Sequence, residues 1–169
     1  STTAQIAALT TKQVTGLSTD DFGALTTAQM GAFTTANLVI LSTDQFQAIS
    51  TASVSALKTS QIQALSTDAI VALSTAQAGA LSTSALAALS TAQLAAIETA
   101  DIEALTTYQI GNLSTATLKA LSTGQLVAIE TTDIQALKTS QLATLATSTV
   151  AALSTDQIQA LLTSQLGAL

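Results

Sequence analysis

Polar side chains that could bind or react recur in this chain at a spacing of eight residues. Hydroxyls come as doublets, such as Ser154-Thr155, and an amide follows, as at Gln157. The chain has no His and no Cys, no hydroxyl that differs from the many like it, and no Gly-rich phosphate loop. Nucleophilic, acid–base and phosphate-binding sites need such distinct groups. The sequence therefore predicts a protein that is not an enzyme and that uses no cofactor.

The acidic side chains form the one cluster with metal-binding potential. Glu98, Asp101 and Glu103 are followed by Glu130 and Asp133, which repeat the spacing of the first two. Carboxylate oxygens are ligands that Ca²⁺ prefers, but the spacing fits neither an EF-hand nor a glycine-rich nonapeptide loop. A solvated acidic surface is the simpler interpretation, and cation binding near Glu98 and Glu130 stays an open alternative.

Charge and hydropathy exclude several classes of partner. The formal net charge is −6 and the only basic residues are four Lys, so no basic stripe exists to neutralise nucleic acid or an anionic membrane. A hydroxyl doublet interrupts every apolar run, so none approaches the ~18 residues of a membrane span. With 48% hydrophobic residues the chain is too apolar to be disordered, and we expect a narrow core of small and medium side chains.

An eight-residue unit, here called the octad, repeats 21 times over residues 2–169 without insertion or deletion. We number its positions 1 to 8 from Thr2 to Leu9. Position 2 is Thr in every octad, position 5 is always apolar, and position 8 is always Leu, Ile or Phe, whereas positions 3 and 6 vary freely. No linker or composition shift interrupts the pattern. We therefore expect residues 1–169 to form a single continuous repeat array without separate domains.

The octad pattern favours helix over strand. At about 100° per residue, position 8 lies at the centre of an apolar face flanked by positions 4 and 5, and the variable positions 3 and 6 lie opposite. A strand would send positions 3 and 6 to opposite faces, and Ala, Leu and Gln are good helix formers. One long helix is excluded, because eight residues advance the wheel by about 80° beyond two turns and the apolar stripe would wind around the rod.

The hydroxyl doublet supplies the break between helices. Thr is favoured at the N-cap, where its oxygen accepts hydrogen bonds from the first turn, and Ser154 and Gln157 have the spacing of a capping box. Position 1 is sometimes Lys or Glu, as at Lys58 and Glu98, whereas position 2 never changes, so we take the position 2 Thr as the cap. These predicted caps include Thr3, Thr11, Thr19, Thr27, Thr35, Thr43, Thr155 and Thr163.

Gln occupies position 4 in every second octad, and the alternate octads hold mixed residues there. The Gln column comprises Gln13, Gln29, Gln45, Gln61, Gln77, Gln93, Gln109, Gln125, Gln141 and Gln157. We predict an all-α solenoid of very short helices, with 8-residue units paired into 16-residue coils and a length of about 90–105 Å. The Gln column is expected to be structural, each amide bonding a corner carbonyl or the Gln one coil away. A β-solenoid with 16-residue coils is the rival fold.

The whole chain resembles the Ala/Leu/Thr/Gln-rich octapeptide-repeat regions, of the type LSTxQIxAL, found in large bacterial secreted or surface proteins. Residues 153–161 carry this motif in full. The resemblance implies a bacterial origin, an extracellular or cell-surface location and an extended spacer role. It carries no catalytic residue to this chain.

We therefore expect a structural repeat protein, an elongated rod that serves as an extracellular filament subunit or as a stalk or spacer. Both ends keep the octad pattern instead of ending in a polar capping repeat, so either the chain is a slice of a longer array or copies stack head to tail. One alternative is a binding scaffold that presents variable surface residues, such as Glu103, Tyr108 and Lys119, to an unknown partner. Another is a Thr array that binds ice or a similar ordered surface.

Overall fold

The computed structural model describes residues 2–169, and within them every octad forms one short α-helix and no strand occurs. This confirms the all-α solenoid and rules out the β-solenoid. The helices are α1 (Thr3–Ala7), α2 (Thr11–Thr15), α3 (Thr19–Gly23), α4 (Thr27–Met30), α5 (Thr35–Leu38), α6 (Thr43–Gln47), α7 (Thr51–Ser55), α8 (Thr59–Ala64), α9 (Thr67–Val71), α10 (Thr75–Ala80), α11 (Thr83–Ala88), α12 (Thr91–Ala96), α13 (Thr99–Glu103), α14 (Thr107–Gly111), α15 (Thr115–Ala120), α16 (Thr123–Val127), α17 (Thr131–Ile134), α18 (Thr139–Leu142), α19 (Thr147–Ala151), α20 (Thr155–Ala160) and α21 (Thr163–Leu166).

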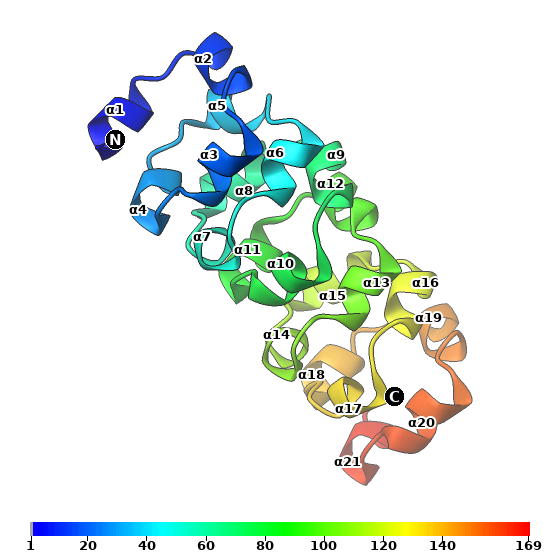
Figure 1. The fold of residues 1–169 in the computed structure, drawn as a ribbon. Helices are drawn as coiled ribbons and strands as arrows, with labels where there is room; N and C mark the ends of the chain where they lie inside the picture. Colours follow the sequence, from blue (N-terminus) through cyan, green and yellow to red (C-terminus); the bar gives the residue numbers. More distant parts are fainter. Residues whose placement is uncertain (1) are drawn as a thin grey trace.

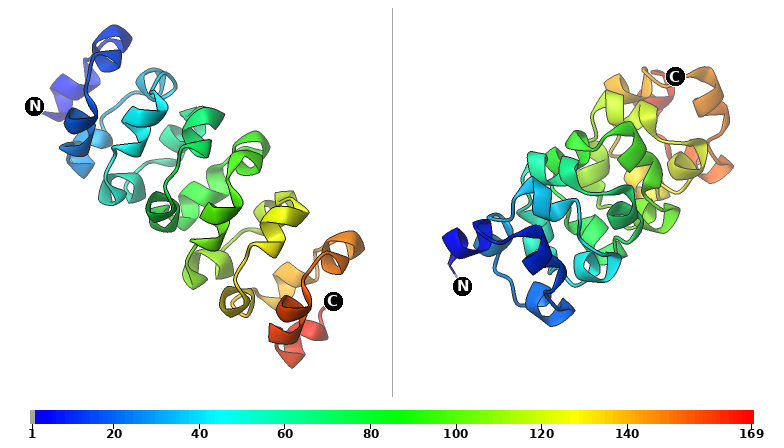
Figure 2. Two further views of the ribbon diagram at one scale, coloured as in Figure 1. Left: turned by 45° about the vertical axis from the view of Figure 1, so that its right-hand side comes forward. Right: turned by 90° about the horizontal axis from the view of Figure 1, so that it is seen from above.

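One coil of the solenoid contains three helices. The helices that pack on each other lie three apart along the chain, as α7 packs against α4 and α10. The coils follow one another along one axis, with the termini at opposite ends (Figures 1 and 2). The predicted pairing of octads into 16-residue coils is therefore wrong, since three octads and not two make one coil. Seven coils at a helix spacing of about 8–10 Å give a rod about 55–70 Å long instead of 90–105 Å.

The conformation of the corners explains why the chain does not reverse after each helix. The last residue of one octad and the first of the next are both extended, as at Leu65 (φ −65°, ψ 140°) and Ser66 (φ −68°, ψ 158°). Short helix reversals commonly use a left-handed residue at the helix end, and no described residue, glycine included, has a positive φ. The extended corner turns the chain by less than a half turn, so three helices are needed to close a coil.

The helix caps lie one residue earlier than predicted. Each N-cap is the residue at position 1, and the Thr at position 2 is the first helical residue, so the assignment of Thr3, Thr11, Thr19, Thr27, Thr35, Thr43, Thr155 and Thr163 as caps is wrong. An N-cap needs extended dihedral angles, and only position 1 has them. The capping box of Ser154 and Gln157 is confirmed.

Where position 1 lacks a hydroxyl but position 4 is Gln, half of the capping box survives. The Gln61 side-chain oxygen still accepts the backbone N–H of Lys58 at 3.0 Å, and that of Gln165 accepts the N–H of Leu162 at 2.8 Å. The amide at position 4 therefore caps the helix by itself. At Glu98, Glu130 and Ala146, where position 4 is not Gln, the helix forms without any side-chain cap.

The core is a continuous column of side chains from positions 5 and 8. Phe22, Phe46 and Ile110 are each 0% exposed, and the rings of Phe22 and Phe33 stack with centroids 5.8 Å apart in the first coils. Position 3 is exposed in every octad and position 6 in nearly all. The helical wheel thus assigned the inner and outer faces correctly, because that assignment depends only on the geometry within one octad.

Candidate functional site: the glutamine braces and the ends of the rod

A single glutamine side chain connects two helices that lie four octads apart. The Gln157 side-chain oxygen accepts the backbone N–H of Ser154 at 3.1 Å, at the start of α20. Its amide nitrogen donates to the carbonyl oxygens of Leu126 and Ile129, at 3.0 and 2.8 Å, at the end of the α16 octad. The side chain is 1% exposed. We call this arrangement a glutamine brace.

The brace recurs along the array. The amide nitrogen of each of nine buried glutamines donates to the position 8 carbonyl four octads earlier, at 2.6 to 3.1 Å: Gln45, Gln61, Gln77, Gln93, Gln109, Gln125, Gln141, Gln157 and Gln165. The last carbonyls of a helix have no partner within it, and burying them unpaired would cost free energy. Of the two partners expected for these amides, the structure shows the corner carbonyl.

The brace reconciles the two-octad period of the sequence with the three-octad coil. Because each brace joins position 4 of one octad to position 8 four octads earlier, a Gln octad of the alternating series always braces another Gln octad. The helix on which it stacks, three octads earlier, belongs to the alternate series. The alternation of Gln at position 4 therefore reflects which corners are braced and does not indicate how many helices form a coil.

The alternate octads fill the same slot with different side chains. The Asn37 amide donates to the Leu9 carbonyl oxygen at 3.0 Å, and the Ser53 hydroxyl donates to that of Leu25 at 3.3 Å. Ala69 and Ala85 are buried there and carry no donor. The alternate corners are therefore held less uniformly than the braced ones.

Three aspartates occupy this same position in three different environments. Asp21, in the first coil, is exposed, and hydrogen bonds from the backbone N–H and hydroxyl of Ser18 lower its pKa. Asp133 is buried and accepts a hydrogen bond from the Thr107 hydroxyl. Asp101 is buried too, but its Oδ2 has no hydrogen-bond partner. Burial, with a smaller contribution from the negative charge of Glu98, raises the pKa of Asp101 to about 6.

The predicted acidic cluster divides between the surface and the interior. Glu98, Glu103 and Glu130 are exposed, whereas Asp101 and Asp133 are buried. Among residues 2–169, no group of three His, Cys, Asp or Glu side chains is placed to hold a metal ion. The repeated spacing in the sequence did not indicate which of the carboxylates face inward.

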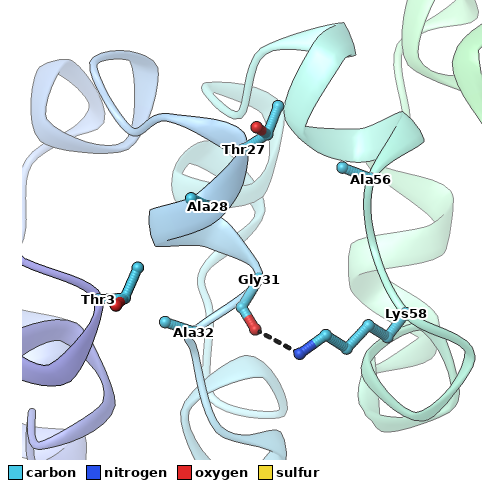
Figure 3. A pocket seen from close by; sticks show the side chains of 7 residues that line it. All are labelled: Thr3, Thr27, Ala28, Gly31, Ala32, Ala56 and Lys58. Atoms are coloured by element: carbon cyan, nitrogen blue, oxygen red, sulfur yellow. Dashed lines mark hydrogen bonds between the residues drawn. The ribbon is translucent and has the colours of Figure 1, made fainter.

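The remaining polar columns lie on the surface. The position 2 Thr is exposed in every octad except that of Thr83, where it is half-buried. Tyr108 is 72% exposed, and Lys119 is also exposed. A shallow hollow of about 440 Å³ lies over α1, α4 and the corner before α8 (Figure 3), where the Lys58 ammonium donates to the Gly31 carbonyl oxygen at 3.1 Å. It holds no acid–base pair.

The two ends of the rod present opposite halves of the brace. At the N-terminal end, the amides of Gln5 and Gln13 are exposed and the position 8 side chains of Leu9, Leu17 and Leu25 are only partly covered. At the C-terminal end, Leu166 and Leu169 are 45% and 46% exposed. In the brace pattern, the amides that would bind the corner carbonyls of Leu145, Leu153 and Leu161 would stand beyond Leu169. The N-terminal end thus carries two amide donors, at Gln5 and Gln13, with the Asp21 carboxylate in the third place, and the other end carries carbonyl acceptors.

No helix within residues 2–169 is long and apolar enough to cross a membrane.

The ALTTAQ repeat matches the chain in seven overlapping stretches: residues 2–35, 16–51, 27–59, 47–83, 79–107, 94–128 and 126–163. The six letters of its name stand unchanged at residues 24–29, which form the corner before α4 and its first turn. No curated protein and no solved structure matches the chain. Since the matches together span nearly every octad, the chain belongs to the ALTTAQ repeat family.

Proposed function

We propose that this chain is a structural rod that stacks head to tail on further copies of itself, as an extracellular filament subunit or as a stalk or spacer. The observation that carries the proposal is the complementarity of the two ends. Each coil is held by amides that point back along the chain to carbonyls of the preceding coil, so the last coil keeps acceptors and the first keeps donors. A contact between unlike faces repeats without closing and generates an open filament.

The register of such a contact follows from the repeat itself. Helices three octads apart pack on each other, so a second copy that continues the superhelix from the C-terminal face places its first helix on α19. Gln5 of the second copy then faces the carbonyl of Leu145, and Gln13 of that copy faces Leu153. Asp21 of that copy faces Leu161 and supplies no amide there, so two of the three positions form braces. The exposed Leu166 and Leu169 would be covered by the first coil of that copy. A further coil of the same polypeptide would use the same chemistry.

The family and the all-helical repeat fold support a structural, non-enzymatic role. The location at the bacterial surface or outside the cell is part of the proposal and rests on the resemblance to octapeptide-repeat regions of secreted and surface proteins. The lack of cysteine is compatible with this location without requiring it.

Sedimentation velocity and negative-stain electron microscopy of the purified chain, over a range of concentrations, test the stacking. We expect fibres one rod wide that lengthen with concentration. The double variant Leu166→Lys with Leu169→Lys should stay monomeric, because two charges would be buried at the contact. The matched control Val127→Lys, at a residue 42% exposed in the sixth of the seven coils, should assemble normally. A monodisperse monomer at every concentration, or assembly unchanged by the end variants, would contradict the proposal.

The Thr column supports a second candidate function, the binding of ice or a similar ordered surface. Capping is carried out by position 1, so it does not explain why position 2 is Thr in every octad. Because three helices form a coil, these side chains make three rows, and one of them runs Thr3, Thr27, Thr51, Thr75, Thr99, Thr123 and Thr147, exposed throughout. Regularly spaced hydroxyl and methyl groups of this kind match an ordered surface better than a flexible partner.

Thermal hysteresis of ice growth tests this second candidate. The double variant Thr75→Tyr with Thr99→Tyr breaks one row in its middle, and Ala76→Tyr with Ala100→Tyr adds the same rings at the neighbouring exposed position. Ice binding predicts hysteresis in the wild-type chain and in the control, with a clear loss in the Thr variant. Absence of hysteresis in the wild-type chain would dismiss this function.

A further inference from the structure

Asp101 occupies a slot that is built for a hydrogen-bond donor. It stands at position 4 of its octad, in α13. In a brace such as that from Gln93 to Leu65, the position 4 side chain bonds the carbonyl 28 residues earlier. For Asp101 that residue is Leu73, between α9 and α10. At the equivalent place in α5, the side chain of Asn37 donates to the Leu9 carbonyl oxygen at 3.0 Å. Asparagine and aspartate have the same length and shape, so a carboxyl group at this position has the length to reach the corresponding carbonyl.

The environment of Asp101 disfavours an ionised carboxylate. The side chain is 2% exposed and its Oδ2 has no hydrogen-bond partner. The helices packed against α13 are α10 and α16, and neither carries a charged side chain. Helix α9 carries only Asp68, and α13 itself adds Glu98 and Glu103. No positive charge on these elements faces the carboxyl, and a carbonyl oxygen cannot donate to it.

We propose that the protonated side chain of Asp101 holds the corner at Leu73 through a hydrogen bond that is lost when the carboxyl ionises. As a neutral acid it donates its O–H to the Leu73 carbonyl oxygen, in place of the amide used elsewhere. When it ionises, the donor is lost and two electron-rich oxygens face each other, so the contact between the α9–α10 corner and α13 loosens. The rod therefore contains one corner whose strength depends on pH.

The stability that Asp101 gives to the corner should fall as the pH rises. The pKa of Asp101 in the folded chain is raised to about 6 from a usual value of 3.8, with burial as the first cause and Glu98 as the second. A group whose pKa is raised by folding contributes stability that is fully present below the unfolded value and is lost as the pH rises through the folded value. The corner should be strongest at pH 4 and below, should weaken between about pH 4 and 6, and should change little above that.

Urea unfolding of the wild-type chain and of Asp101→Asn at pH 4, 5, 6 and 7.5 tests the proposal. The Asn variant keeps a donor at every pH, as Asn37 does. We expect both proteins to be similar near pH 4, and the unfolding constant of the wild-type chain to rise relative to the variant by up to about tenfold per pH unit until pH 6. The matched control Asp133→Asn should show no such pH-dependent gain in stability over the wild-type chain, because the Asp133 carboxylate already accepts a hydrogen bond from the Thr107 hydroxyl.

Three results would overturn the proposal. A difference that does not change with pH means that Asp101 does not change its protonation state here. If the variant is less stable than wild type at pH 7.5, the carboxylate accepts a hydrogen bond in the folded chain. The candidate donor is the Thr75 hydroxyl, because Thr75 precedes Asp101 by the same number of residues as Thr107 precedes Asp133. Stabilisation of the wild-type chain alone by added Ca²⁺ means that the carboxylate binds a cation.

If Asp101→Asn does not fold, carbon-13 NMR titration of the Asp101 carboxyl in the wild-type chain tests the proposal instead. A titration midpoint near pH 6 supports the proposed hydrogen bond, and a midpoint at pH 4 or below contradicts it.

Discussion

The side-chain amide of Gln93 donates a hydrogen bond to the carbonyl oxygen of Leu65 at 2.9 Å, although four octads separate the two residues along the chain. The oxygen of the same amide accepts the backbone N–H of Ser90 at 3.0 Å. Glutamine alone among the residues at position 4 performs both tasks. Asn37 is too short for the second, as its helix has no capping box, and a carboxylate cannot perform the first. This double role gives a physical reason for Gln in every second octad.

Loss of one brace should destabilise the rod measurably. In Gln93→Ala the carbonyls of Ile62 and Leu65 lose the amide that donates to them at 2.8 and 2.9 Å. An unsatisfied buried carbonyl costs about 1–3 kcal/mol, so we expect a loss of that size in urea unfolding followed by circular dichroism. The control Gln63→Ala removes an exposed amide at position 6 and should change stability by less than about 0.5 kcal/mol. Equal effects of the two substitutions would show that the braces contribute nothing specific.

The corrected position of the caps predicts unequal effects within one hydroxyl doublet. The Ser122 hydroxyl accepts the backbone N–H of Gln125 at 3.2 Å, whereas Thr123 is the first residue of α16 and is exposed. Ser122→Ala should cost about 0.5–2 kcal/mol, as the loss of an N-cap does, and Thr123→Ala should cost clearly less. Thermal unfolding of both variants provides the comparison, and the reverse order would restore position 2 as the cap.

Sequence reasoning succeeded where the cause is local and failed where it is not. Helix, core face and outer face all follow from side-chain order within one octad, and the structure agrees at positions 3, 5 and 8. The number of helices in a coil depends on the corner dihedral angles at residues such as Leu65 and Ser66. The residue types at these positions do not predict those angles. The alternation of Gln suggested two helices per coil, but Gln157 acts across four octads. The buried state of Asp101 likewise depends on the neighbouring coils.

Glycine at position 6 of α14 lets two coils approach closely. A Cβ at Gly111 would lie 2.9 Å from the Ala136 carbonyl oxygen and 3.3 Å from the Ala136 Cβ, whereas a Cβ at Gly124 would meet only the Ser122 hydroxyl at 3.9 Å. Gly111→Ala should therefore destabilise by about 1–3 kcal/mol through overpacking. Gly124→Ala should stabilise by about 0.5–1 kcal/mol through helix propensity. Urea unfolding measures both, and a stabilising Gly111→Ala would show that α14 and α17 can move apart at little cost.

The exposed Asp21 should make α3 depend on pH in the sense opposite to Asp101. Its carboxylate accepts the backbone N–H and the hydroxyl of Ser18 at 2.9 and 2.8 Å, and these hydrogen bonds lower its pKa below the usual 3.8. A lowered folded pKa contributes stability that is present above the unfolded value and is lost as the pH falls through the folded one. We expect Asp21→Ala to reduce hydrogen-exchange protection of the Phe22 amide, which donates to the Ser18 carbonyl oxygen, at pH 6 but much less at pH 2. Asp20→Ala, at the exposed position 3, is the control, and a deficit as large at pH 2 as at pH 6 would show that the carboxylate charge has no part in holding the start of the helix.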